Sequence, residues 1–521
     1  MLATLVTAVV NGLRGELIRV EVDVAPGLPA CNIVGLPDAA LSEARERVRA
    51  AIRNSGFEYP ASRITVNLAP ADRRKRGAAY DLAIAVGVLL ASGQIRNGGG
   101  PWALIGELGL SGELRTLAGA LPMVSTLVRA GHRRIGLPLE NVAEAEMVTG
   151  VHVVGLAGLD DAARLVAGPR GRIAARARRR PTVVVSQARD SGSMRLAGTL
   201  EPVDLAEVRG QQHARWAVEV ALAGGHNLLM VGPPGAGKTL LARAIPGLLP
   251  PLHQDEALEV AVIESVAGIL TQAGPSARRP FRAPHHTSSY AALVGGGPGL
   301  MPGEASLAHR GVLFLDELAE FDRNVLDALR EPLEEGVITI ARANGRVRYP
   351  ARFQLVAAMN RCRCGQAGTD ERPCRCPTGD ADRYVARVSG PFIDRLDLRI
   401  DMARVRPAEL LSGRSAESSA LVAARIAQAR ARQHRRAPGI VNAMLPGGLV
   451  QNACAVDRAT AARLVDLAEV GGMSARGIHR VMRVARTIAD LADRASVSES
   501  DVLAAAALRE PGDEARSGRA A

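Results

Sequence analysis

The sequence predicts an α/β fold built around a parallel sheet, and three short apolar runs lead to this prediction. Residues 228–231, after Asn227, run directly into a glycine-rich loop and then into an alanine- and leucine-rich stretch. Residues 312–315 are followed by two acids, and residues 355–359, after Gln354, by an asparagine. Short continuous apolar runs are typical of strands buried on both faces of a parallel sheet. The polar residues after these runs should therefore meet at the carboxyl edge of the sheet, where such sheets bind ligands.

The glycine-rich loop has the pattern of a phosphate-binding loop. It reads Gly232, Pro233, Pro234, Gly235, Ala236, Gly237, Lys238 and Thr239. In this pattern the glycines let backbone N–H groups face the phosphates of ATP, the lysine meets the β- and γ-phosphates, and the threonine hydroxyl binds Mg²⁺. The helix that follows adds the positive end of its dipole. An ordinary tight glycine turn is the alternative.

Lysine usage favours the phosphate-binding interpretation. The chain contains 65 lysines and arginines together, but Lys75 and Lys238 are the only lysines. A compact ammonium fits between phosphates where a planar guanidinium does not. The presence of a lysine at this position of an arginine-biased chain therefore supports a phosphate-binding loop.

Length and composition indicate a protein of several domains. With 521 residues, the chain exceeds the size of one ordinary core. A net charge of +12 permits an anionic partner such as DNA, although arginine bias alone gives the same charge. With two tryptophans, five tyrosines and six phenylalanines, base stacking is disfavoured, so we expect contacts to phosphates. Neither a membrane span nor a signal peptide is indicated, which predicts a cytoplasmic protein without a membrane partner.

Residues 1–168 are expected to form an α+β domain. Apolar and polar residues alternate over 20–24 and over 64–68, which is the period of half-buried strands. Between them, a helix is predicted that Asp38 caps and Gly56 ends.

Two segments of this region carry a family resemblance. Gly27–Asp38 and Asn67–Leu82 resemble the N-terminal domain of the ComM/YifB family of magnesium-chelatase-like AAA+ ATPases, a domain similar in fold to the proteolytic domain of Lon. Lon proteases use a serine/lysine dyad. Here Ala79 stands at the serine position, and no lysine lies between Lys75 and Lys238 to serve as its partner. A regulated protease is therefore disfavoured, and a structural or partner-binding role is expected.

The polar residues after the remaining strands are candidates for ATP hydrolysis. Asp316 should hold the Mg²⁺ shell and Glu317 should activate the attacking water. By resemblance, Asn360 occupies the first-sensor position and Arg476 the second-sensor position of the same protomer. Arg395 matches the arginine finger that reaches into the nucleotide of the neighbouring subunit. Without the family, a surface salt bridge would be the simpler interpretation of either arginine.

Adjacent histidines and a cysteine cluster invite a metal interpretation. His285 and His286 lack the spacing that aims two rings at one ion, so packing or hydrogen bonding is expected. Four cysteines form Cys-x-Cys, nine residues and Cys-x-Cys, namely Cys362, Cys364, Cys374 and Cys376. Four thiolates would suit structural Zn²⁺. Stable disulfides are disfavoured in the cytosol. The remaining alternative to a zinc site is therefore four unliganded thiols.

Two basic segments are candidates for DNA contact. Residues 169–200 are rich in arginine and then in serine and glycine, which indicates a solvated linker or a DNA-binding arm. Residues 337–349 read as a hairpin turning at Asn344-Gly345, with Arg342, Arg346 and Arg348 near its tip. A solvated tip is the alternative to a DNA contact.

The resemblance covers nearly the whole chain and implies its organisation. It predicts a Lon-like domain without a catalytic dyad (1–168), an arginine-rich linker (169–200), an AAA+ core (201–405) with a cysteine-rich insert (361–377), a helical lid (406–509) and a tail (510–521). It implies ATP hydrolysis in a homo-hexameric ring and DNA branch migration or helicase action in recombination or natural transformation. The alternative function is a chaperone-like ATPase that remodels a protein partner such as a metal chelatase.

Overall fold

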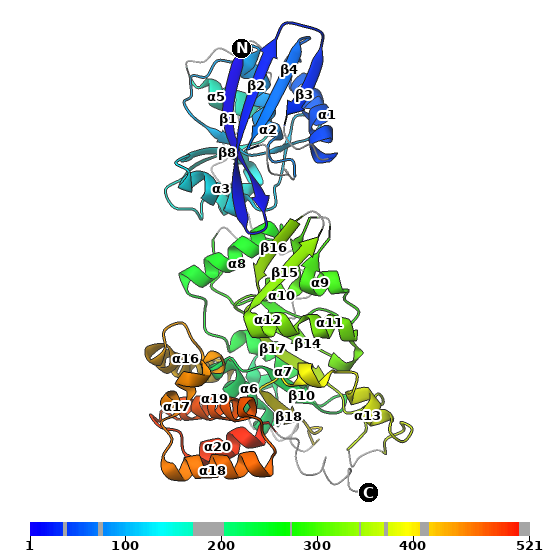
Figure 1. Cartoon of the computed structure of the whole chain (residues 1–521), viewed down its shortest axis with the longest axis vertical. Helices are drawn as coiled ribbons and strands as arrows, with labels where there is room; N and C mark the ends of the chain where they lie inside the picture. The colour runs from blue at the N-terminus through cyan, green and yellow to red at the C-terminus, as the bar shows by residue number, and fades with distance from the viewer. Residues whose placement is uncertain are drawn as a thin grey trace. The chain divides into compact units, whose positions relative to one another are not determined.

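The computed structural model describes most of the chain (Figure 1). The described residues are 1–34, 39–70, 77–169, 203–270, 274–297, 299–342, 345–368, 373–406 and 416–509. Asp38, Lys75, nearly all of the predicted linker and the predicted tail lie outside these ranges. The described residues fall into two compact units: unit 1 within Met1–Met194, Gln254–Ser276 and Ala341–Tyr349, and unit 2 within Arg195–His253, Ala277–Ile340 and Pro350–Ala521.

Unit 1 contains a seven-stranded mixed sheet. Its strand order is β3-β4-β2-β1-β5-β8-β9, with bounds Ala30–Val34, Arg63–Ala69, Arg14–Ala25, Leu2–Asn11, Ala103–Leu104, Arg134–Pro138 and His152–Leu156. β1 pairs antiparallel with β2, which pairs antiparallel with β4. Val20, Val22, Ile64, Val66 and Leu68 are fully buried, which confirms both alternating strands. The predicted helix is α1 (Ala39–Asn54), and Gly56 after it has a left-handed φ of 82°.

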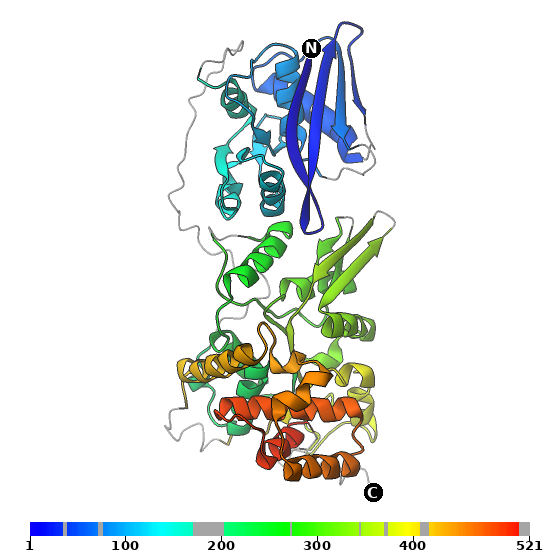
Figure 2. The same cartoon turned by 60° about the vertical axis from the view of Figure 1, so that its left-hand side comes forward.

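Helices pack on this sheet and form the core of unit 1. α2 (Asp81–Ala91) is buried along nearly all of its length and packs on β1 and β2. α3 (Ala120–Arg129) lies against the same two strands (Figure 2). The remaining elements are short: β6 (Glu107–Leu108), β7 (Leu114–Arg115), α4 (Val142–Ala145) and α5 (Leu159–Ala167).

Two later segments of the chain, within Gln254–Ser276 and Ala341–Tyr349, complete unit 1, and the sequence did not predict this. α8 (Gln254–Val266) packs against α3. At its end, the carbonyl of Ser265 accepts a 2.8 Å hydrogen bond from the Gly119 amide, and the Ser265 hydroxyl donates to Glu144. Glu144 also accepts a 2.8 Å bond from the Leu121 amide. α8 is therefore attached to unit 1 through buried polar contacts as well as apolar packing.

Unit 2 is built on a five-stranded parallel sheet. Its order is β11-β14-β17-β10-β18, with bounds Phe281–Arg282, Val312–Leu315, Gln354–Met359, Leu228–Val231 and Leu398–Asp401. Every residue of β10, β14 and β17 is buried, so the three apolar runs are confirmed as central strands. α6 (Gln212–Gly224) and α7 (Lys238–Ala244) flank β10 in the sequence.

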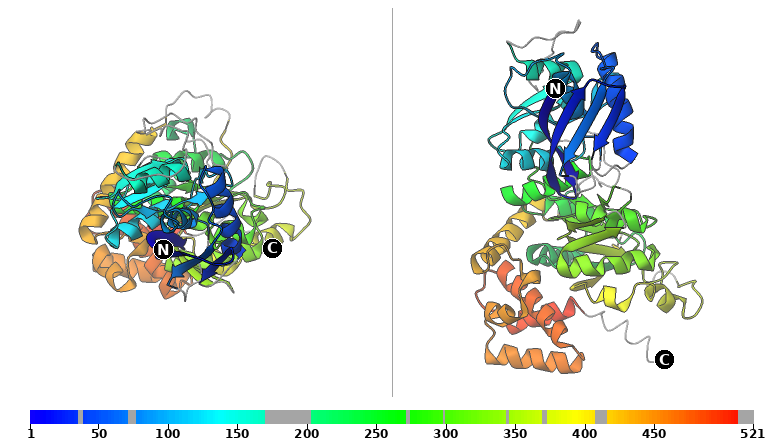
Figure 3. Two further views of the ribbon diagram at one scale, coloured as in Figure 1. Left: turned by 90° about the horizontal axis from the view of Figure 1, so that it is seen from above. Right: turned by 45° about the horizontal axis from the view of Figure 1, so that its top comes forward.

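The C-terminal part of unit 2 is helical (Figure 3). It consists of α16 (Ser419–Arg436), α17 (Gly447–Cys454), α18 (Arg458–Val470), α19 (Ala475–Leu491) and α20 (Glu499–Ala507). α19 packs on α16, α17 and α20, and both α16 and α19 contact α6. A fully buried ion pair within α19 joins Arg486 to Asp490 at 3.0 Å.

The predicted hairpin is present as β15 (Val337–Arg342) paired with β16 (Gly345–Pro350). Residues 341–349 of this hairpin belong to unit 1. Short elements of unit 2 include α9 (Tyr290–Val294), β12 (Gly295–Gly296), β13 (Met301–Pro302), α10 (Glu304–Leu307), α11 (Arg323–Ala328), α12 (Arg330–Glu335), α13 (Asp380–Val385) and α14 (Gly390–Ile393). Across the described ranges, no helix combines the length and apolar character required to cross a bilayer.

Candidate nucleotide-binding site

Three neighbouring strands of unit 2 deliver the predicted site residues to one edge of the sheet. β14, β17 and β10 are adjacent and parallel, so the residues after them emerge side by side. The loop after β10 turns at Gly235 and Gly237, whose φ angles of 80° and 88° lie in the left-handed region that favours glycine. α7 begins directly after this turn.

Lys238 lies over the glycine loop and is largely buried. Its ammonium donates to the carbonyls of Gly232 at 2.6 Å and Pro233 at 3.0 Å, and to Asn360 Oδ1 at 3.0 Å. Burial lowers the pKa of this ammonium, while the nearby carboxylates of Asp316 and Glu317 act in the opposite direction. The predicted phosphate-contacting lysine and the predicted first-sensor asparagine are thus direct neighbours.

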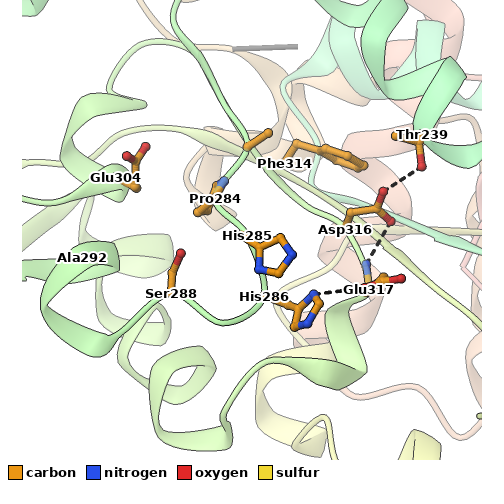
Figure 4. A pocket seen from close by; sticks show the side chains of 11 residues that line it. Thr239, Pro284, His285, His286, Ser288, Ala292, Glu304, Phe314, Asp316 and Glu317 are labelled. Carbon is orange, nitrogen blue, oxygen red and sulfur yellow. Dashed lines mark hydrogen bonds and ion pairs between the residues drawn. The ribbon is translucent and has the colours of Figure 1, made fainter. Parts of the chain in front are cut away.

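Thr239 and Asp316 form a pair of oxygen groups suited to a divalent ion. The Thr239 hydroxyl donates to Asp316 Oδ2 at 2.7 Å, and the Glu317 amide donates to Asp316 Oδ1 at 2.9 Å (Figure 4). Hydroxyl and carboxylate oxygens are hard ligands of the kind that Mg²⁺ prefers. The two residues therefore fit the ion that the sequence assigned to them.

Glu317 stands in a strained backbone conformation next to a histidine. Its φ of 53° is left-handed, which costs a non-glycine residue roughly 1–3 kcal/mol. One carboxylate oxygen of Glu317 lies 3.0 Å from His286 Nδ1. The neighbouring ring of His285 is 4.1 Å from that of His286, and its Nδ1 bonds the Thr287 hydroxyl at 2.8 Å. The expectation of hydrogen bonding is confirmed.

His286 is a site residue whose position the sequence did not reveal. Both histidines line a pocket of about 500 Å³ together with Thr239, Asp316 and Glu317 (Figure 4). They follow β11, which pairs with β14, so the sheet order brings them to the acids. A strand of two residues gives too weak a pattern to be recognised in advance.

Arg395 and Arg476 converge on one carboxylate oxygen. Each donates to Glu334 Oε1 at 2.6 Å. The hydrogen bond from Arg476, aided by Arg395, lowers the pKa of Glu334. The family resemblance predicts that these arginines act on nucleotides on opposite sides of a subunit boundary, whereas in the structure they share a partner within one chain.

The four cysteines of the insert lie together. Their sulfurs are all within 4.8 Å of one another, and three of the separations are 3.4, 3.5 and 3.7 Å. Zinc–sulfur bonds of about 2.3 Å in a tetrahedron place sulfurs about 3.8 Å apart. Cys362 is fully buried, whereas Cys374 is exposed. The donor set and its spacing fit a tetrahedral zinc ion.

The hairpin presents its three arginines to solvent. Arg342, Arg346 and Arg348 are exposed, while the intervening Val347 and Tyr349 are buried. This alternation follows from the two-residue period of a strand.

Ala79 of unit 1, which the sequence predicts at the position of the Lon nucleophile, is buried.

Comparison with known proteins defines the class first. Three family models match: "Magnesium chelatase, subunit ChlI" over residues 204–410, "Subunit ChlI of Mg-chelatase" over 20–141 and "Magnesium chelatase, subunit ChlI C-terminal" over 416–509. Unit 2 therefore has the α/β architecture of a magnesium-chelatase-type, AAA+-related protein.

Relatives that match over nearly the whole chain then identify the family within this class. An uncharacterized protein of Mycobacterium tuberculosis is 44% identical over 514 residues, covering 96% of this chain and 97% of the relative. YifB of Escherichia coli is 42% identical over 502 residues, covering 96% and 94%. Competence protein ComM of Haemophilus influenzae is 41% identical over 483 residues, covering 92% of each. The chain belongs to the ComM/YifB family of magnesium-chelatase-like proteins.

Proposed function

We propose that this protein hydrolyses ATP at the edge of the unit 2 sheet. The observation that carries the proposal is the pair of hydrogen bonds at the end of three parallel strands, Lys238 to Asn360 and Thr239 to Asp316. A lysine over a glycine loop, beside a hydroxyl–carboxylate pair, is an arrangement suited to phosphates with a divalent ion.

Each residue has a distinct role in this proposal. Lys238 neutralises the β- and γ-phosphates, and Thr239 and Asp316 hold Mg²⁺, which would screen the charge of the phosphates. Glu317 accepts a proton from the attacking water, and Asn360 orients that water without adding charge. The backbone amides of the Gly232–Gly237 loop surround the phosphates.

The site is completed across a subunit boundary in a homo-hexameric ring. In this assembly, Arg395 approaches the γ-phosphate held by the next protomer, and Arg476 senses nucleotide from the C-terminal helices, which act as a lid. A guanidinium added to the developing charge accelerates phosphoryl transfer strongly in other phosphate-loop enzymes. Unit 1, which resembles the Lon domain without its dyad, has a structural or partner-binding role.

The proposed work of the ring is on DNA in the cytoplasm, by branch migration or helicase action in recombination or transformation. Three points support this proposal: the exposed arginines of the β15–β16 hairpin, the net charge of +12, and the 41% sequence identity to a relative named a competence protein. The arginines would contact phosphates, because stacking aromatics are scarce.

The deciding experiment measures ATP turnover with and without forked and four-way DNA. Stimulation by DNA, together with strand displacement, supports the proposal. Turnover that DNA leaves unchanged, with nucleotide-dependent binding to a protein partner, would instead support the chaperone-like ATPase. The magnesium-chelatase family models are the observation in favour of that second function.

We also propose that the four clustered cysteines bind one structural Zn²⁺. Thiolates can approach this closely only if their charges are compensated, and a zinc ion does so directly. Metal analysis of protein purified without added zinc should find about one zinc per protomer. Absence of metal, with all four thiols titratable in the folded protein, would contradict this.

A further inference from the structure

The cysteine insert is joined to the proposed nucleotide site by a short and continuous piece of chain. β17 ends at Met359, whose carbonyl accepts a 3.1 Å hydrogen bond from the Gly232 amide at the start of the glycine loop. The next residue, Asn360, bonds Lys238 at the end of that loop. Cys362 follows two residues later.

The insert then returns to the loop and packs against it. Gly365 is buried, and a Cβ added to it would lie 2.3 Å from Cδ of Pro234. The loop carbonyl of Pro234 also accepts a 3.2 Å bond from Arg404. Between Met359 and Gly365, the chain therefore contacts the glycine loop at its beginning, its middle and its end.

The cysteine cluster closes this segment on itself. Cys362 and Cys364 belong to the turn that ends at Gly365, and their sulfurs lie 3.7 and 3.5 Å from that of Cys374. Within the turn, the Gly365 amide donates to the Cys362 carbonyl at 3.0 Å and the Ala367 amide to the Cys362 sulfur at 3.3 Å. A bond from one ion to all four sulfurs would fix the turn far more firmly than these contacts do.

The surrounding charges favour a tetrathiolate site. Four thiolates with one Zn²⁺ carry a formal charge of about −2. The cysteines alternate with Arg361, Arg363 and Arg375, which can offset it. Arg361 in addition lies 3.2 Å from Asp401 at the end of β18, so the base of the insert is fixed to a second strand next to β10.

We propose that the zinc-bound cysteine insert is a brace that holds the phosphate-binding loop and Asn360 in their nucleotide-binding geometry. This inference rests on the proposed zinc site and extends it: metal occupancy controls nucleotide affinity. If loss of the metal leaves the loop competent about one tenth of the time, the apparent Kd for nucleotide rises roughly tenfold.

The test separates the brace from the metal by using a variant that keeps every cysteine. Gly365→Ala adds a methyl group against Pro234, and Gly379→Ala is the matched control. Gly379 has nearly the same φ, 78° against 76°, but no atom within 4 Å of an added Cβ. Both substitutions place an alanine at a left-handed φ, and only the first one disturbs the contact with the loop.

Zinc content and affinity for a fluorescent ADP analogue are measured on the full-length protein. We expect Cys362→Ser and Cys374→Ser to lose zinc and to bind the analogue roughly tenfold more weakly. Gly365→Ala should keep its zinc and show a similar loss of affinity. Gly379→Ala and Cys31→Ser, which changes a cysteine outside the cluster, should behave as the parent. Circular dichroism identifies any variant that has failed to fold, and chelation of the folded parent protein then replaces that variant.

Two outcomes would overturn the brace, and they are distinguishable. If neither purified nor zinc-supplemented protein holds the metal, the zinc site is wrong and the brace fails with it. If zinc is present but its removal, and Gly365→Ala, leave the affinity unchanged, the zinc site stands and the brace is wrong.

Discussion

At the scale of single residues, Lys238 and Glu317 should fail in different ways. Lys238→Ala removes the charge that meets the bound phosphates, so ATP binding should be lost. Glu317→Gln removes only the group that accepts the proton of water, so ATP should bind normally while turnover falls by roughly 10²–10⁴. Binding and turnover are measured separately by filter retention and phosphate release. Normal turnover by Glu317→Gln would disprove its role as the base.

His286 offers a second test at this scale. Its ring nitrogen lies 3.0 Å from the Glu317 carboxylate, so it can orient that carboxylate toward the water. We expect His286→Ala to reduce kcat roughly tenfold with little change in ATP affinity, because a misplaced base affects chiefly the chemical step. His285→Ala, a change on the neighbouring ring, serves as the control. An unchanged kcat would leave His286 with packing alone.

At the scale of elements, His226 links the start of β10 to α19. It is fully buried, bonds Thr487 at 2.8 Å and lies 4.0 Å from Asp397. Burial lowers its pKa to about 4; Asp397 opposes the shift and Arg483 adds to it. The unfolded chain therefore binds more protons than the folded one between about pH 6.5 and about pH 4. The contribution of neutral His226 to the free energy of unfolding is therefore fully present above this window. It is lost as pH falls through the window, which lowers the free energy of unfolding by roughly 3 kcal/mol.

This acid sensitivity should disappear when the titrating group is removed. His226→Gln should show a smaller drop in the free energy of unfolding between about pH 7.5 and about pH 5 than the parent. The exposed His213→Gln is the control and should retain the parent's drop. Urea unfolding at both pH values measures the difference. Equal drops in parent and His226→Gln would show that His226 is not the group responsible.

The hairpin is the element on which the DNA proposal can be tested. Replacing Arg342, Arg346 and Arg348 by alanine should weaken binding to DNA of any sequence. It should also reduce the slope of log K against log salt by up to about three, since each phosphate contact releases about one counterion. ATP turnover without DNA should persist. The control removes the same charge from exposed positions elsewhere, namely Arg53, Arg96 and Arg458. Equal effects of the two triple variants would leave the hairpin with a structural role only.

The sequence predicted those parts of the fold that continuous segments determine. β10 is followed directly by the glycine loop, and β14 is followed directly by the two acids. Their meeting at one edge therefore follows from parallel order. The contact of His286 with Glu317 could not be predicted, because it depends on the register of a two-residue strand. Glu334 was likewise missed, since nothing in the spacing of α12 indicates that two distant arginines share it.

At the scale of the whole molecule, a shared site predicts complementation between inactive subunits. Lys238→Ala and Arg395→Ala should each abolish turnover, but an equal mixture should restore about a quarter of the sites, where an intact loop meets an intact arginine. A mixture of Lys238→Ala and Glu317→Gln should restore none, because both residues belong to one protomer. ATP turnover after subunit exchange measures the recovery. Equal recovery in the two mixtures would contradict an arginine supplied by the neighbour.

Unit 1 is built from three separate segments of the chain, and this determines how the protein responds to proteolysis and to truncation. Between its first and last described residues, the chain passes between the two units five times: between 169 and 203, and at 253–254, 276–277, 340–341 and 349–350. Proteolysis within 170–202 would therefore give two fragments, one with α3 and the other with α8. The packing of α3 on α8 and the hydrogen bond between Ser265 and Glu144 would hold the two fragments together. A truncated chain that begins at residue 203 would expose the side of α8 that α3 normally covers. Nicking should be tolerated, whereas truncation should yield an aggregating protein.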